Sequence, residues 1–130
     1  MSRIHSCLAA FALIATASTA ATEEDDYRLP YGCGDLVVIG RVRTLGYTDL
    51  SGPDDLLGHG RFDVEVRIKR VVRGTESRRS LRAHRIAHGQ LVANRDFLIV
   101  LTPEKEGQYV LSTAALARGS AFRRLADKCT

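Results

Sequence analysis

Residues 62–69 constrain the fold of this chain more than any other stretch. Apolar and charged side chains alternate strictly along it. The apolar positions are Phe62, Val64, Val66 and Ile68, and the charged positions are Asp63, Glu65, Arg67 and Lys69. Because successive side chains of a β-strand point to opposite faces, this pattern predicts a strand with one buried and one solvated face. Val71 and Val72 break the alternation, which predicts a bulge before Gly74.

Four further strands are predicted at residues 35–45, 78–88, 94–101 and 108–112. Residues 35–45 are apolar on both faces, which indicates a central strand, and Gly40 in its middle indicates a bulge or a bend. Residues 46–60 are rich in glycine, aspartate and proline and are predicted to be a loop. Residues 78–88 carry several arginines and fit an edge strand, and residues 103–107 are predicted to make a hairpin turn.

A short C-terminal helix is predicted at residues 120–128. Ser120 is a suitable N-cap, and Phe122, Leu125, Ala126 and Cys129 follow helical spacing. Five strands in one small domain, with a kinked first strand and a final helix, predict an all-β fold: a five-stranded Greek-key barrel of the OB type.

The first 20 residues have the order of a secretory signal peptide. Arg3 precedes an uncharged apolar run at 7–17, and the small residues Ser18, Thr19 and Ala20 follow. The run is about half the ~20 residues that a membrane-spanning helix needs. We therefore predict a signal peptide at 1–20, a flexible leader at 21–32 and the OB-like domain at 33–130. The protein is expected to be exported, to the periplasm or beyond, with no membrane span.

Cys33 and Cys129 are the two cysteines that would remain after removal of the signal peptide. In an oxidising compartment they are predicted to form one disulfide that joins the two ends of the domain. Closing so long a loop stabilises a fold by about 4–5 kcal/mol in the chain-entropy model. The alternative is a pair of free thiols.

Positive charge is concentrated between residues 61 and 88, a stretch that contains nine arginines or lysines and three acidic residues. OB-type barrels often bind ligands on the sheet face around their second and third strands. The predicted binding residues are therefore Arg67, Lys69, Arg82 and His84. Such a cluster attracts anionic partners. The alternative is a merely solvated face in an arginine-rich protein.

No catalytic residue, metal ligand or cofactor is predicted from the motifs. His84 and His88 lie about 13 Å apart if residues 78–88 form a strand, which is too far for one metal ion. His59 is interpreted as a polar loop residue. The loop aspartates do not follow the EF-hand pattern, and Ser51 lacks the surrounding glycines of a nucleophile elbow. A hydrolase whose carboxylate pair is assembled only by the fold remains open.

Two segments resemble a known family. Residues 33–42, CGDLVVIGRV, and 62–74, FDVEVRIKRVVRG, resemble the first two strands of netrin-like modules and of the tissue inhibitors of metalloproteinases. The resemblance implies a binding or inhibitory module rather than an enzyme. In the inhibitors a cysteine at the mature N-terminus binds the catalytic zinc. Here Cys33 lies about a dozen residues beyond the predicted mature start, and Asp35 stands in place of the next cysteine.

The sequence therefore predicts an exported, non-enzymatic binding module. Its expected partner is a protein, a protease among the candidates, or an anionic envelope polymer, bound through the basic face or the 46–60 loop. Nucleic acid is not expected, because Tyr47 and Tyr109 are the only candidates for base stacking. The alternatives are a small periplasmic hydrolase and a structural envelope protein.

Overall fold

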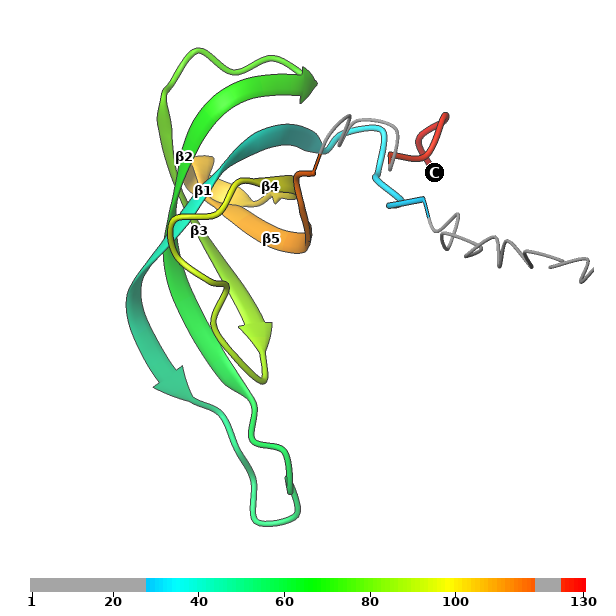
Figure 1. Ribbon diagram of the computed structural model, residues 1–130. Coiled ribbons are helices and arrows are strands. Elements are labelled where there is room, and N and C mark those ends of the chain that lie inside the picture. The colour runs from blue at the N-terminus through cyan, green and yellow to red at the C-terminus, as the bar shows by residue number, and fades with distance from the viewer. Residues whose placement is uncertain (1–27, 119–124) are drawn as a thin grey trace, which may run out of the picture.

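The computed structural model describes residues 28–118 and 125–130, which form a closed five-stranded β-barrel (Figure 1). Its strands are β1 (Leu36–Asp49), β2 (Gly60–Arg73), β3 (Ser80–Ala87), β4 (Phe97–Pro103) and β5 (Tyr109–Leu116). They follow the order β1-β2-β3-β5-β4 around the barrel, and only β3 and β5 are parallel. A single 3-10 turn, η1 (Lys105–Gly107), joins β4 to β5. The predicted OB-like Greek-key barrel is confirmed.

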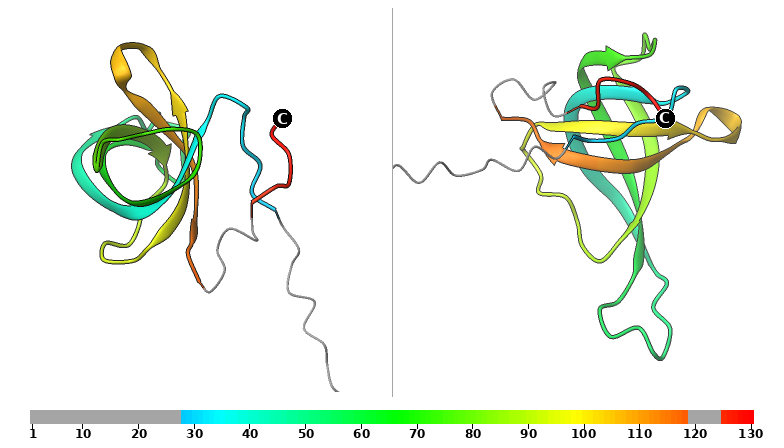
Figure 2. Two further views of the ribbon diagram at one scale, coloured as in Figure 1. Left: turned by 90° about the horizontal axis from the view of Figure 1, so that it is seen from above. Right: turned by 90° about the vertical axis from the view of Figure 1, so that its right-hand side faces the viewer.

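β1 and β2 are long, bent strands that wrap around the barrel (Figure 2). Their pairing skips Leu45, Lys69 and Val72, so the ladder contains three bulges. Bulges bend a strand and increase its twist, which helps a sheet to close. Next to the middle bulge, a Cβ added to Gly40 would lie 2.4 Å from the carbonyl oxygen of Arg67, so only glycine allows the strands to approach there. The predicted irregularities at Gly40 and before Gly74 are confirmed.

The barrel interior is filled by alternate residues of every strand. We call this set the interior cluster: Leu36, Val38, Val42, Phe62, Val64, Val66, Leu81, Ala83, Phe97, Ile99, Leu101 and Leu111. The apolar positions predicted for residues 62–66 are all in it, with Val66 fully buried. The solvated partners of these positions point outward, as the alternation predicted.

A second apolar group, the outer cluster, covers the outside of β1 and β4. It consists of Leu29, Val37, Leu98, Val100 and Leu125. Leu29 and Leu125 form an isolated parallel β-bridge and are 3% and 4% exposed. The disulfide between Cys33 and Cys129 is confirmed, with a Cα–Cα distance of 4.8 Å across 96 residues of sequence. It ties residues 28–33, which precede β1, to residues 125–130, and both segments cover this face, so residues 28–32 of the predicted leader are part of the fold.

Three predicted elements differ from the structure. Strand pairing continues to Asp49 and Gly60, so the predicted 46–60 loop is reduced to residues 50–59 at the tip of a projecting hairpin (Figure 1). β3 is not an edge strand, because it pairs with both β2 and β5. The barrel closes through this short parallel pairing.

The predicted helix at 120–128 is not present in its described part. Residues 120–124 lie outside the described residues, as do the predicted signal peptide and residues 21–27. Leu125 forms the bridge to Leu29, and the amides of Ala126 and Thr130 donate to the carbonyls of Leu29 and Tyr31 at 2.9 and 3.1 Å. These long-range bonds hold the segment against residues 29–31 in an irregular path, so its residues do not form the predicted helix. In the described ranges, no helix is long and apolar enough to cross a membrane.

Candidate functional site

A groove of about 420 Å³ lies on the outer face of β1, β2 and β3. Its lining combines guanidinium, imidazole, carboxylate, amide and aliphatic groups. The lining residues are Leu45, Gly46, Arg61, Asp63, Val64, Arg82, Ala83, His84 and Gln108. Most of these residues belong to β2 and β3, so the groove lies on the strand 2–3 face that OB-type barrels use for ligands. Gln108 comes from the end of the β4–β5 connection.

Strand register explains why these side chains meet. Gly46 of β1 lies opposite Asp63 of β2, which in turn lies opposite His84 of β3. Gly46 contributes no side chain, and a Cβ there would lie 3.7 Å from the Asp63 carboxylate. The bulged residue Leu45 comes just before it and is 45% exposed. The glycine therefore leaves open space over the central strand, and the bulge places an aliphatic wall beside it.

The charges that line the groove are unequally compensated. The Nε of Arg61 donates to the Asp63 carboxylate at 3.2 Å. His84 is largely enclosed, with its Nδ1 3.7 Å from a carboxylate oxygen of Glu104. Arg82 is exposed and has no ion-pair partner in the described part of the chain. The groove therefore presents one guanidinium that is free to accept an anionic ligand.

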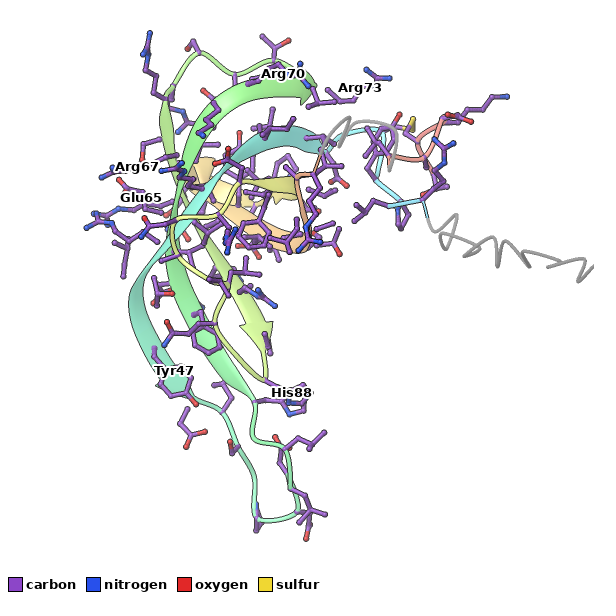
Figure 3. All side chains as sticks on the ribbon, viewed as in Figure 1. Tyr47, Glu65, Arg67, Arg70, Arg73 and His88 are labelled. Carbon is purple, nitrogen blue, oxygen red and sulfur yellow. A yellow bond between two sulfur atoms is a disulfide. The ribbon has the colours of Figure 1, made fainter. Side chains whose placement is uncertain are left out.

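Arg67, one of the predicted binding residues, lies outside the groove and is engaged elsewhere (Figure 3). Its Nε lies 3.4 Å from Glu65, which also accepts from Arg43 at 3.0 Å and from the Ser80 hydroxyl at 2.8 Å. The hydrogen bond from Ser80, followed by that from Arg43, lowers the pKa of Glu65. Arg67 therefore belongs to an exposed ion-pair network rather than to the groove.

Lys69 also lies outside the groove, because it is the extra residue of a β-bulge. Its Nζ donates to Asp96 at 2.6 Å, and Arg41 donates to the other oxygen of the same carboxylate at 2.9 Å. The bond from Lys69 is the main reason that the pKa of Asp96 is lowered. Of the four predicted binding residues, the structure brings Arg82 and His84 together and directs Arg67 and Lys69 to carboxylates.

Arg61, Asp63 and Gln108 were not predicted as site residues. The alternation of residues 61–69 carried a signal for the first two, since it places them on the same outward face as Arg67. No local signal marked Gln108, because its position depends on how the β4–β5 connection meets β3. Arg61 and Asp63 could therefore be predicted from the sequence, whereas the position of Gln108 results from the closure of the barrel.

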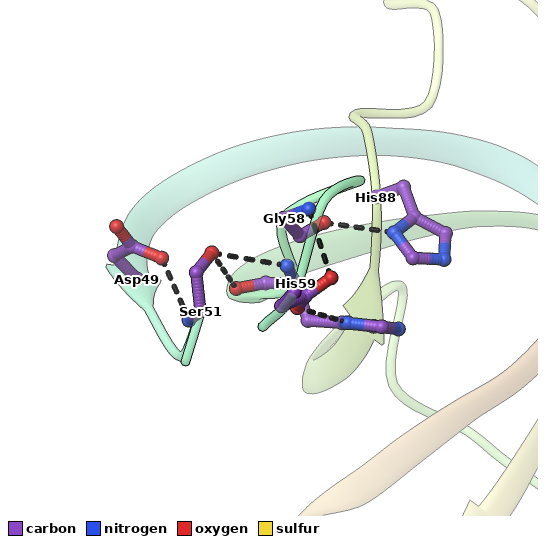
Figure 4. A network of polar contacts seen from close by, with 6 residues as sticks. Asp49, Ser51, Gly58, His59 and His88 are labelled. Atoms are coloured by element: carbon purple, nitrogen blue, oxygen red, sulfur yellow. Dashed lines mark hydrogen bonds and ion pairs between the residues drawn. The ribbon is translucent and has the colours of Figure 1, made fainter. Parts of the chain in front are cut away.

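The tip of the β1–β2 hairpin forms a second polar network (Figure 4). The Asp49 carboxylate accepts from the Ser51 amide at 2.9 Å, and the Ser51 hydroxyl accepts from the His59 amide at 3.2 Å. The carbonyl of Gly58 accepts from Nδ1 of His88 at 2.8 Å. His84 and His88, considered together as metal ligands in the sequence, thus lie in different surroundings. In the described ranges, no group of three or more His, Cys, Asp or Glu side chains could hold a metal ion.

The protein is an OB-like β-barrel with an outer groove large enough for a small ligand. Comparison with protein-family models, with curated proteins and with solved structures finds no match to this chain.

Proposed function

We propose that the protein is an exported, non-enzymatic binding module that holds an anionic envelope polymer in the groove on β1–β3. The observation that carries the proposal is Arg82, an exposed guanidinium in the groove without an ion-pair partner in the described part of the chain. The disulfide supports an oxidising compartment, in line with the predicted signal peptide.

The chemistry of the groove suits repeated anionic groups. A guanidinium offers a planar fork of donors that matches carboxylate, sulfate or phosphate. Arg61 reinforces the positive potential, although its Nε is already bonded to Asp63. Leu45 and Gln108 supply an aliphatic surface and an amide beside these charges, which suits a sugar chain. The resemblance to netrin-like modules supports a binding role in the same way.

The proposal is tested by exchanging one arginine at a time. Arg82→Gln should raise the Kd for a sulfated polysaccharide such as heparin about tenfold, because a charge-assisted hydrogen bond is lost. Arg67→Gln is the matched control: it removes the same charge from the same face but outside the groove, and should change the Kd less than about twofold. Isothermal titration at two salt concentrations measures both. An equal loss in the two variants would mean diffuse attraction and reject the groove.

The choice of probe separates the partner classes. Binding to heparin or to a polyuronate that weakens with salt and depends on Arg82 supports the polymer. Binding to poly-glutamate alone would replace the polymer with an acidic protein as the partner.

A further inference from the structure

Two histidines from distant parts of the sequence lie side by side at the base of the hairpin tip. Gly60 pairs with Ala87 at the last position of the β2–β3 ladder, so the next residues outward, His59 and His88, lie opposite each other. Their ring centroids are 4.0 Å apart, with an angle of 48° between the ring planes. Nothing in local sequence spacing links the two, since 28 residues separate them.

The hydrogen bonds define which nitrogen of each ring carries the proton. A backbone carbonyl can only accept, so His88 must donate from Nδ1 to Gly58. Nδ1 of His59 lies 2.5 Å from a carboxylate oxygen of Asp55, whose pKa is lowered chiefly by this bond, so His59 also donates from Nδ1. In the neutral rings each Nε2 therefore carries a lone pair. Neither Nε2 has a hydrogen-bond partner in the described part of the chain.

We propose that His59 and His88 form a two-histidine site for a divalent transition-metal ion, ligated through their Nε2 atoms. In Figure 4 the ring nitrogens that bear no dashed line point to the same side, away from the loop. Metal–imidazole bonds of about 2.0–2.1 Å can bridge two nitrogens on rings this close together. Water completes the coordination, because the chain contributes two ligands.

The surroundings of the rings are those that metal-binding histidines commonly have. Such histidines donate their second ring nitrogen to a carboxylate or a backbone carbonyl, which fixes the ring and raises its basicity. Here Asp55 does this for His59 and the carbonyl of Gly58 does it for His88. The other oxygen of Asp55 accepts from the Gly58 amide at 3.0 Å. The Asp55 carboxylate therefore positions both the His59 ring and the residue whose carbonyl binds His88.

The ligand type selects the class of ion. Imidazole nitrogens suit Cu²⁺, Ni²⁺ and Zn²⁺, whereas Mg²⁺ and Ca²⁺ require oxygen ligands. Affinity should follow the usual order, with Cu²⁺ above Zn²⁺. A bound ion would join the 50–59 loop to the segment that follows β3.

The test is titration of the full chain, disulfide intact and without an affinity tag, with Zn²⁺ and with Cu²⁺. Calorimetry should give one ion per chain. His59→Ala and His88→Ala should each lower the affinity at least about tenfold, and Asp55→Asn should lower it about 10- to 100-fold, as loss of an outer partner of a ligand does. His84→Ala, which removes a histidine outside the pair, is the control and should leave the affinity unchanged.

A second measurement separates ligation from a folding defect. Zn²⁺ should shift the ¹⁵N resonances of Nε2 in both histidines, while His84 stays unmoved, and the variants should keep the circular dichroism of the parent. The absence of binding up to millimolar Zn²⁺ and Cu²⁺ would overturn the site. So would binding that survives both histidine variants, or binding that is lost to the same degree in His84→Ala.

Discussion

The two apolar clusters of this protein are enclosed by different means. The interior cluster is surrounded by the five strands, and its residues alternate with solvated ones along β2 and β3. The outer cluster lies on the other face of β1 and β4, where Val37, Leu98 and Val100 would otherwise meet water. It is covered by the segment before β1 and by residues 125–130, through Leu29 and Leu125. Strand pairing closes the first cluster, whereas one isolated bridge, a few hydrogen bonds between the two covering segments and the disulfide close the second.

This difference indicates where the disulfide acts. The described terminal segments contribute few apolar side chains, and the ion pair between Arg28 and Asp127 that accompanies them is exposed, with its atoms 3.7 Å apart. Exposed ion pairs contribute about 0–1 kcal/mol. The covalent link therefore has to supply the stability that a short cover cannot obtain from its own packing, while the interior cluster needs no such link.

The largest effect is expected from removal of the disulfide. Cys33→Ser with Cys129→Ser should lower the free energy of unfolding by about 4–5 kcal/mol, because the link closes a loop of nearly the whole domain. Denaturant unfolding measures the change. Hydrogen exchange should show that the bridge amide of Ala126 loses protection before the β1–β2 ladder does. Equal loss in both regions would mean that the two clusters unfold as one unit.

The next largest effect is expected at Leu125, and it should depend on the disulfide. Leu125→Ala should lower stability by about 2–4 kcal/mol in the oxidised protein, from lost burial and the cavity that remains. In the variant without the disulfide the loss should be smaller, because the segment that carries Leu125 is no longer held in place. A double-mutant cycle measures the difference. Additive effects would show that the cover stays docked without the disulfide.

Val66→Ala is the matching change in the interior cluster. It should lower stability by about 1–3 kcal/mol, because Val66 is fully buried. The loss should be the same with and without the disulfide, since strands enclose this position on all sides. Coupling to the disulfide as strong as that of Leu125 would remove the distinction between the clusters.

Acid should lower the stability of the fold through Glu76. The Glu76 carboxylate accepts from Arg78 at 2.8 Å and from the Tyr109 hydroxyl at 3.3 Å. Tyr109 packs against the interior cluster. These bonds, Arg78 first, lower the pKa of Glu76 from 4.5 to about 2. A lowered pKa in the folded state stabilises the fold above pH 4.5, and this contribution is lost as the pH falls toward 2. Unfolding of the parent and of Glu76→Gln should therefore differ at pH 6 and converge near pH 2.

The smallest effect is expected at Arg67, one position from Val66. Arg67→Ala should change stability by about 0.5 kcal/mol or less, since its side chain is 66% exposed and its ion pair is at the surface. Thermal unfolding of both single variants compares the two faces of one strand. A loss at Arg67 as large as that at Val66 would show that the Glu65 network is part of the stabilising core.

Several features were determined by the sequence alone. Period-two alternation at 62–69 specified a strand and its buried face, because neighbouring side chains of an extended backbone must point in opposite directions. The prediction that residues 35–45 are apolar on both faces was also correct: Val38 packs in the interior cluster and Val37 in the outer one. The disulfide could be predicted because Cys33 and Cys129 are the two cysteines outside the predicted signal peptide.

Other features were decided only by the tertiary structure. The bulge at Lys69 directs that side chain to Asp96, so the linear cluster of basic residues divides between two carboxylates and the groove. The non-helical path of the segment at Leu125 depends on its bridge to Leu29, which outweighs a local helical pattern. His59 and His88 meet because of strand register. Local periodicity reports which way a side chain faces, but neighbours across strands are set by pairing between residues far apart in the sequence.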